Sequence, residues 1–142
     1  MIRINAADSY GNAAGFNPTD GARRHICTLG EAVPSCELDT KNNEVVHRSG
    51  TSFATPIAVA IAAIVLGFID GTGDLGVPED FERLKPRLRT RSGMESVLCK
   101  TCVLQREEER AGFSYITPWF FFEIEQSSRV GIITNELRNC PE

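Results

Sequence analysis

Hydrophobic and polar positions in the first third of the chain follow short patterns that are typical of strands. Isoleucine alternates with polar residues over 2–5, which indicates a short strand. The apolar runs 26–33, interrupted by a glycine, and 44–47 indicate two more. A polar loop is expected over 34–43, between these two runs. The last strand leads directly into a cluster of small polar residues.

Residues 52–69 have the strongest helical pattern of the chain. Alanine, isoleucine, valine and leucine occur on every side of the predicted helix, so we expect it to be surrounded by protein. Thr51 or Ser49 can cap its start. Pro56 is expected in the first turn, where its missing N–H costs nothing. The glycine-rich segment 71–76 is expected to end the helix.

The second half of the chain is more charged and is expected to be mainly helical. Helices are predicted near 78–85, 91–98 and 128–137. The aromatic segment 119–122 (WFFF) follows a proline and is predicted to cover a hydrophobic surface.

Composition limits the class of protein. The chain has 142 residues, 42% hydrophobic and 24% charged, which is typical of one soluble globular domain. Its net charge is −4 and no basic stripe occurs, so neither nucleic acid nor a membrane surface is expected as a partner. The uncharged run 53–69 is shorter than a membrane span of about 20 residues, which favours a buried core helix. No signal-peptide pattern opens the chain, and the compartment stays unknown.

The cysteines do not form a recognisable framework. Their number is odd and their spacing irregular, which argues against a set of disulfides. The pair Cys99 and Cys102 has no second pair and no histidine at zinc spacing. Reduced, partly buried thiols are therefore expected rather than metal or redox chemistry. The five residues are Cys27, Cys36, Cys99, Cys102 and Cys140.

A strand, a tight glycine-containing turn and a helix that starts at a serine form a chemically useful unit. The start of a helix carries unpaired N–H groups and partial positive charge. Ser52 can therefore present its hydroxyl to a carbonyl while its own N–H stabilises the oxyanion that develops. Small neighbours, Gly50, Thr51 and Ala54, keep the approach open. From spacing alone, Ser52 is equally well interpreted as a cap on a core helix.

The segment SGTSFATPIAVAIAA, residues 49–63, closely resembles the nucleophile motif of subtilisin-like serine proteases, G-T-S-x-A-x-P, and the helix that follows it. The matching residues are Gly50, Thr51, Ser52, Ala54 and Pro56. Residues 2–16 resemble the family's strand and turn V-x-x-V-x-A-x-D. Residues 28–35 (TLGEAVPS) lie where the family has a loop before the serine strand.

The resemblance implies a fold and an activity. Residues 1–70 would be the C-terminal part of a subtilase catalytic domain, an α/β three-layer fold with a mostly parallel sheet, incomplete here. Residues 71–142 would be a divergent, mostly helical C-terminal extension of the kind found in fungal subtilases. The implied function is a serine-type endopeptidase that hydrolyses peptide bonds, with Ser52 as the nucleophile and its N–H as half of the oxyanion hole.

The resemblance also bears on cofactors and partners. The family needs no cofactor for its chemistry, and although structural calcium is common in it, we expect no metal here. The acidic residues of the region after the helix are interpreted as a solvated loop; they are Asp70, Asp74, Glu79 and Asp80. The expected partners are a peptide or protein substrate and the missing N-terminal half of the protease domain.

The partners of a catalytic serine are not recognisable in this chain. In the family the triad runs Asp, His, Ser, and only 51 residues precede Ser52. Asp8 lies in a segment that matches a different strand, and His25 lies in a loop with two arginines. His47 is too close along the chain to fold back as a base, and Asn12 is interpreted as a turn residue. We therefore expect the isolated chain to be inactive.

Two other classes of protein are compatible with a serine at the start of a helix. An α/β-hydrolase elbow requires its histidine after the serine, and no histidine follows His47, so this class is excluded. A non-catalytic fragment or pseudoenzyme that acts as an interaction module remains open.

Overall fold

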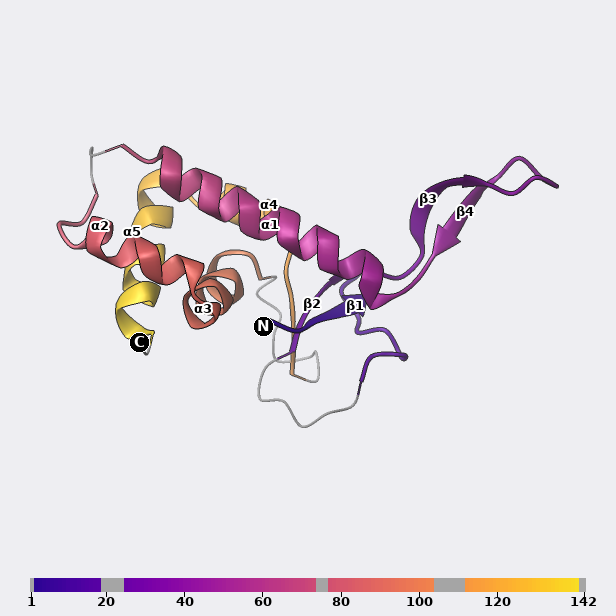
Figure 1. Cartoon of the computed structure of the whole chain (residues 1–142), viewed down its shortest axis with the longest axis horizontal. Coiled ribbons are helices and arrows are strands. Elements are labelled where there is room, and N and C mark those ends of the chain that lie inside the picture. Colours follow the sequence, from indigo (N-terminus) through magenta and orange to yellow (C-terminus); the bar gives the residue numbers. More distant parts are fainter. Residues whose placement is uncertain (1, 19–24, 74–76, 104–111, 141–142) are drawn as a thin grey trace. The chain divides into compact units, whose positions relative to one another are not determined.

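The computed structural model describes residues 2–18, 25–73, 77–103 and 112–140, without the side chains of 36–38 (Figure 1). The chain divides into two compact units. The first is formed mainly by Arg3–Ala58, to which a short strand that ends at Tyr115 is added. The second contains Val59–Gln105 and Ile116–Glu142. The described residues form a mixed α/β structure that contains a parallel sheet.

A three-stranded sheet is the centre of the first unit. It consists of β1 (Ile4–Ala7), β2 (His25–Leu29) and β5 (Phe113–Tyr115), in the order β1-β2-β5. Both pairs are parallel. Parallel strands place their carboxyl ends at one edge of a sheet, so the segments that follow β1 and β2 begin at the same edge.

The two faces of this sheet pack separately. Ala6 packs with Ala14 and Ala54 on one face. On the other face Ala7 and Cys27 pack with Tyr115. The small side chain of Ala6 on β1 therefore lets a helix approach the sheet closely. This helix carries the candidate serine.

A β-hairpin follows the sheet. It consists of β3 (Val33–Leu38) and β4 (Val45–Arg48), which are antiparallel. The polar loop predicted over 34–43 is therefore wrong for its first half, which is strand. Cross-strand pairing overrides the polar composition of this stretch. The turn is closed by the N–H of Asp39, which donates to the carbonyl of Glu44 at 2.8 Å.

Helix α1 (Thr51–Gly71) confirms the predicted long helix, but not its environment. Only one stripe of it is buried in this chain, and Val59 is 62% exposed. The prediction that protein surrounds the helix on all sides is therefore wrong for the described residues, within which 28% of its most apolar window is buried. The buried stripe consists of Ala54, Ala58, Ile61, Val65 and Ile69.

The second unit is helical and contains the helices predicted for this half of the chain. The first of them is short and continues as a 3-10 helix, because Pro86 lies at the start of that segment. The elements are α2 (Phe81–Leu84), η1 (Lys85–Arg89), α3 (Arg91–Thr101), α4 (Pro118–Glu123) and α5 (Gln126–Asn139).

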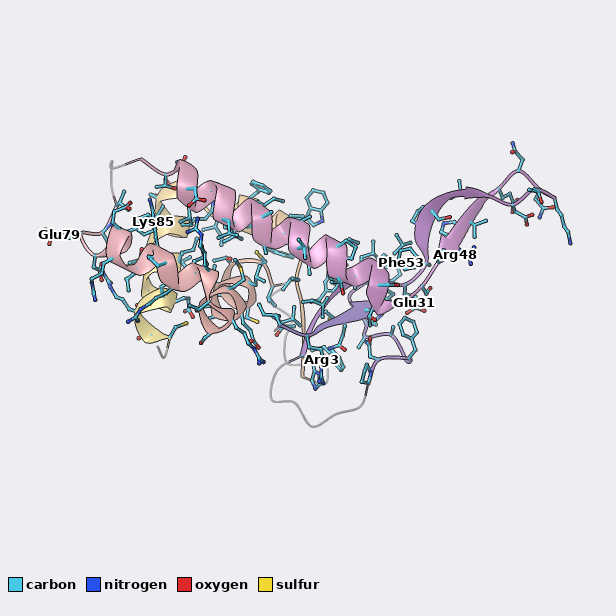
Figure 2. The ribbon with its side chains drawn as sticks, viewed as in Figure 1. Arg3, Glu31, Arg48, Phe53, Glu79 and Lys85 are labelled. Carbon is cyan, nitrogen blue, oxygen red and sulfur yellow. The ribbon has the colours of Figure 1, made fainter. Side chains whose placement is uncertain are left out.

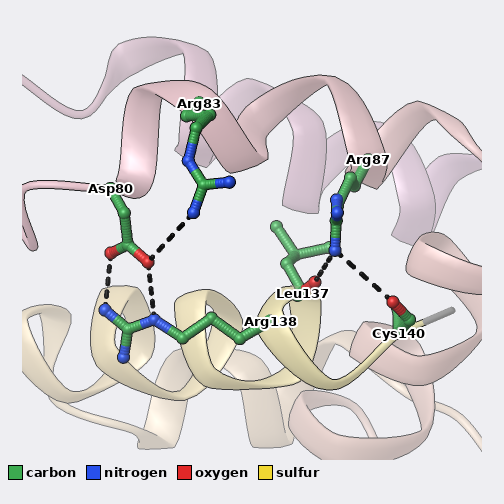
Figure 3. A network of polar contacts seen from close by, with 6 residues as sticks. All are labelled: Asp80, Arg83, Arg87, Leu137, Arg138 and Cys140. Carbon is green, nitrogen blue, oxygen red and sulfur yellow. Dashed lines mark hydrogen bonds and ion pairs between the residues drawn. The ribbon is translucent and has the colours of Figure 1, made fainter. Parts of the chain in front are cut away.

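Polar contacts join the C-terminal end of α5 to η1 and to the residue that precedes α2 (Figure 3). Arg138 Nε donates to the Asp80 carboxylate at 2.7 Å. Arg87 donates to the carbonyl oxygens of Leu137 at 3.2 Å and Cys140 at 3.4 Å. These carbonyls belong to the end of a helix, where no intrahelical partner is left for them. Arg87 thus satisfies the C-terminus of α5.

The aromatic segment predicted to cover a hydrophobic surface does so with only part of its side chains. Phe121 is buried and contacts Phe68 edge-to-face, with ring centroids 5.3 Å apart. The Arg129 guanidinium lies 4.9 Å from the Phe68 ring centroid. Trp119 and Phe122 are exposed, by 69% and 56%.

Candidate active site

Ser52 is the second residue of α1 and its side chain is exposed. Strand β4 ends at Arg48, and after two intervening residues the helix begins at Thr51. In Figure 2, Arg48 and Phe53 mark the two sides of this turn. The position expected for a nucleophile, exposed and at the leading end of an apolar helix, is the one that Ser52 occupies.

Among the residues that the structure describes, neither Ser49 nor Thr51 caps the start of α1 with its side chain. The Ser49 hydroxyl accepts the N–H of Ala32 at 2.9 Å instead of a helix N–H. Thr51 is already helical, which places Gly50, a residue with no side chain, at the capping position. Both predicted caps are therefore wrong. The N–H groups of the first turn that have no intrahelical partner stay available to an anion.

A glycine at the end of β2 allows the close approach of α1 to the sheet. A Cβ at Gly30 would lie 2.8 Å from the Ala6 Cβ and 2.9 Å from the Ala54 Cβ. It would also lie 3.1 Å from the carbonyl oxygen of Gly50. The motif alanine, Ala54, is fully buried here and has no room for a larger side chain. In the sequence, Gly30 interrupts an apolar run. A glycine at such a position is a sign that another backbone approaches closely, and this sign was missed.

Two further motif residues, Gly50 and Pro56, affect the surroundings of Ser52. A Cβ at Gly50 would lie 3.2 Å from the Ser52 hydroxyl oxygen, so glycine leaves that side of the hydroxyl open. Pro56 is the sixth residue of α1, beyond the first turn where it was expected. Its absent N–H is the one that would donate to the carbonyl of Ser52. That carbonyl therefore lacks its helical partner.

The histidines are not arranged as bases for Ser52. His25 is the first residue of β2 and stacks on Phe113, with ring centroids 4.8 Å apart. Ser52 follows the turn tied to the opposite end of β2, and four residues of strand rise by about 13 Å. His47 is exposed on β4. Within the described ranges, no hydrogen bond involves the Ser52 hydroxyl.

Asp8 and Asn12 are used in the turn that follows β1. The Asp8 carboxylate accepts the backbone N–H groups of Tyr10 at 2.9 Å and Asn12 at 2.8 Å, and the Asn12 side-chain amide at 2.9 Å. Slight burial raises the pKa of Asp8, but the hydrogen bonds from Asn12, Tyr10 and Gly11 outweigh it and lower the pKa below its ordinary value. Both residues thus have the turn role expected for Asn12.

The cysteines that the structure describes are thiols and form no disulfide. Burial raises the pKa of Cys102 to about 11, which makes its thiolate rare at neutral pH. Among the described residues no three histidine, cysteine or acidic side chains gather as a metal site. Cys36 and Asp74, which the sequence singled out, lie outside the described side chains.

Comparison with protein-family models, with curated proteins and with solved structures finds no significant match for this chain. The subtilase assignment therefore stays a prediction, and it rests on the sequence motif around Ser52 and on the geometry of that motif.

Proposed function

We propose that this chain carries the nucleophile-bearing part of a subtilisin-like serine endopeptidase. Ser52 is the nucleophile and peptides or proteins are the substrates. The proposal is supported chiefly by one observation: an exposed serine hydroxyl lies at the uncapped start of a long apolar helix. The finer fold, a subtilisin-like three-layer domain of which residues 1–70 are the C-terminal part, belongs to the proposal. So does the view of 71–142 as a helical extension.

The chemistry follows from the start of α1. The Ser52 oxygen attacks a peptide carbonyl, and a base must take the hydroxyl proton and later deliver it to the leaving amine. The negative oxygen that forms on the carbonyl carbon accepts the Ser52 N–H at the positive end of the helix. Gly50 and Gly30 contribute by keeping side chains away from this reaction space.

The same geometry explains why the chain alone is inactive in the proposal. A serine hydroxyl without an adjacent base is a weak nucleophile at neutral pH. No histidine or carboxylate of the described residues bonds to Ser52. The base and its carboxylate partner would come from a segment outside these 142 residues.

The uncovered surface of α1 fits the same proposal. This helix is long and apolar enough to span a membrane by length and composition alone, and 28% of its most apolar window is buried. The core helix of a larger domain has the same properties. The proposal assigns the uncovered apolar surface to the remaining part of the protease domain, not to lipid.

A second candidate function is an interaction module derived from a protease. It is favoured by one observation, the absence of a base beside Ser52 in the described part of the chain. Under this alternative, the Ser52 hydroxyl does not need to react with a substrate.

A thiol substituted at residue 52 tests the position that is proposed for the nucleophile. Ser52→Cys places a sulfur among the N–H groups of the first turn, which favour a thiolate, so we expect an apparent pKa below the ordinary value of about 8.5. Ala63→Cys, exposed in the middle of the same helix, is the matched control. The measurement is the pH dependence of alkylation by iodoacetamide, followed at each peptide by mass spectrometry. Equal profiles for the two variants would contradict the proposed nucleophile position.

A further inference from the structure

We propose that Ser49 is a positioning residue for Ser52, and that its hydroxyl holds the serine-bearing turn to the segment that follows β2. The inference rests on the proposed function of Ser52. It assigns to Ser49 a role that the subtilase motif residues do not cover.

Two hydrogen bonds join the residues just before the helix to the residues just after β2. The Ser49 hydroxyl accepts the N–H of Ala32 at 2.9 Å. The N–H of Gly50 donates to the carbonyl of Gly30 at 2.8 Å. Gly30 is itself fixed, because its N–H donates to the carbonyl of Ala7 at 2.9 Å. Hydrogen bonds thus connect the start of α1 through Gly50 and Gly30 to Ala7 of the central sheet.

The contact with Ser49 is made by a residue in an unfavourable backbone conformation. Ala32 has a φ of 54°, in the left-handed region that residues with a Cβ rarely occupy. Such a conformation persists where surrounding contacts fix it. The hydrogen bond to Ser49 is the contact that fixes the N–H of this residue.

The contact also closes the β3–β4 hairpin at its base. The residues from Gly30 to Gly50 leave the sheet, form the hairpin and return to the same point.

The choice of serine at residue 49 has a second effect. A hydroxyl just before a helix usually caps it by accepting a helix N–H. At Ser49 the oxygen is taken by Ala32, 17 residues away, and the first turn of α1 keeps its N–H groups. Ser49 thus fixes the turn without occupying the place of the oxyanion.

The test is amide hydrogen exchange in the 142-residue chain, measured by NMR. In Ser49→Ala we expect the amides of Ala32 and Gly50 to exchange about fivefold faster, the effect of one lost hydrogen bond. Ser49→Thr retains the hydroxyl and should restore the original rates. Ser9→Ala, at an exposed turn, is the control and should change neither amide.

Unchanged exchange of both amides in Ser49→Ala would overturn the inference, as would a failure of Ser49→Thr to restore it. If Ser49→Ala does not fold, the unsubstituted chain decides. Slow exchange of the Ala32 amide, both in the unsubstituted chain and in Ser49→Thr, supports the contact. Exchange of that amide at the rate of an unstructured peptide overturns it.

A combined variant separates this inference from the proposed function. In Ser52→Cys the apparent thiol pKa should rise towards that of Ala63→Cys when Ser49→Ala is added, and not when Ser49→Thr is added. A low thiol pKa that ignores Ser49→Ala overturns the positioning role alone. A Ser52→Cys thiol that titrates like Ala63→Cys from the outset overturns the proposed function, whatever the exchange rates show.

Discussion

At the scale of single residues, the position of Ser52 depends on small side chains where β2 ends and α1 begins. Gly30 lies against Ala6 and Ala54 with no room for a Cβ. Gly50 leaves the hydroxyl of Ser52 uncovered. The absence of side-chain volume is thus as important to the candidate site as the hydroxyl itself.

Gly30→Ala tests this close approach. The new Cβ would meet two alanine Cβ atoms at 2.8 and 2.9 Å, which forces the helix away from the sheet. We expect a loss of about 1–3 kcal/mol in the free energy of unfolding, measured by urea denaturation. Gly67→Ala, in α1 with nothing within 4 Å of the new Cβ, should gain about 1 kcal/mol. A Gly30→Ala variant as stable as the original chain would contradict the packing described.

Much of the residue scale was predictable, because the motif is local. The exposed position of Ser52 at the start of a helix follows from residues 49–63. The roles of Ser49 and Pro56 did not follow. The partner of Ser49 is 17 residues away. The exact start of α1 decides whether Pro56 lies in the first turn, where its missing N–H has no consequence, or beyond that turn, where the Ser52 carbonyl lacks a donor.

At the scale of elements, α1 is the least ordinary part of the chain. One stripe of it is buried and Phe68 packs against Phe121, while other apolar side chains, such as Val59 at 62%, are exposed. The hydrophobic pattern predicted the helix because length and composition suffice for that. It does not tell which protein segments cover each side, and the prediction of a fully surrounded helix therefore failed.

A pair of alanine substitutions compares the two sides of α1. Ile61 is buried, and Ile61→Ala should cost about 2–5 kcal/mol of unfolding free energy. Val59 is 62% exposed, and Val59→Ala should change it by less than about 0.5 kcal/mol. Urea denaturation of both variants is the measurement. Similar losses at the two positions would mean that both sides of the helix are covered.

The hairpin and the C-terminal helices show the same limit of sequence reasoning. Strand β3 was predicted as loop because its residues are mixed, and its pairing with β4 was not visible locally. Helices α2, α3 and α5 were predicted near their observed positions, since each has its own helical pattern, whereas α4 was predicted only as an aromatic segment. Short β5 was not predicted at all; it is formed by pairing with β2.

At the scale of the whole molecule, charged contacts between distant residues make stability depend on pH. The hydrogen bond from Arg138 lowers the pKa of Asp80 below its ordinary value of 3.8. A carboxylate whose pKa is lowered in the folded state stabilises the fold at pH values above the pKa that it has in the unfolded chain. This stabilisation disappears as the pH falls through the folded pKa.

Asp80→Asn tests this dependence. The variant should unfold at a lower urea concentration than the original chain at pH 7, and the difference between the two should shrink as the pH falls below about 3.8. Glu123→Gln, at an exposed residue of α4, is the charge-matched control and should show no such convergence. A difference that stays constant from pH 7 to pH 2 would contradict a role for the Asp80 carboxylate.

The most direct test of the proposed role of Ser52 is its labelling by a fluorophosphonate, with imidazole added as an external base. We predict no adduct without imidazole, because no base among the described residues bonds to Ser52. With imidazole we predict an adduct that forms on Ser52 and not on Ser9, an exposed turn hydroxyl. Equal labelling of the two serines would mean that Ser52 is an ordinary surface hydroxyl, and labelling of Ser52 without imidazole would mean that the chain holds its own base; either result contradicts the account.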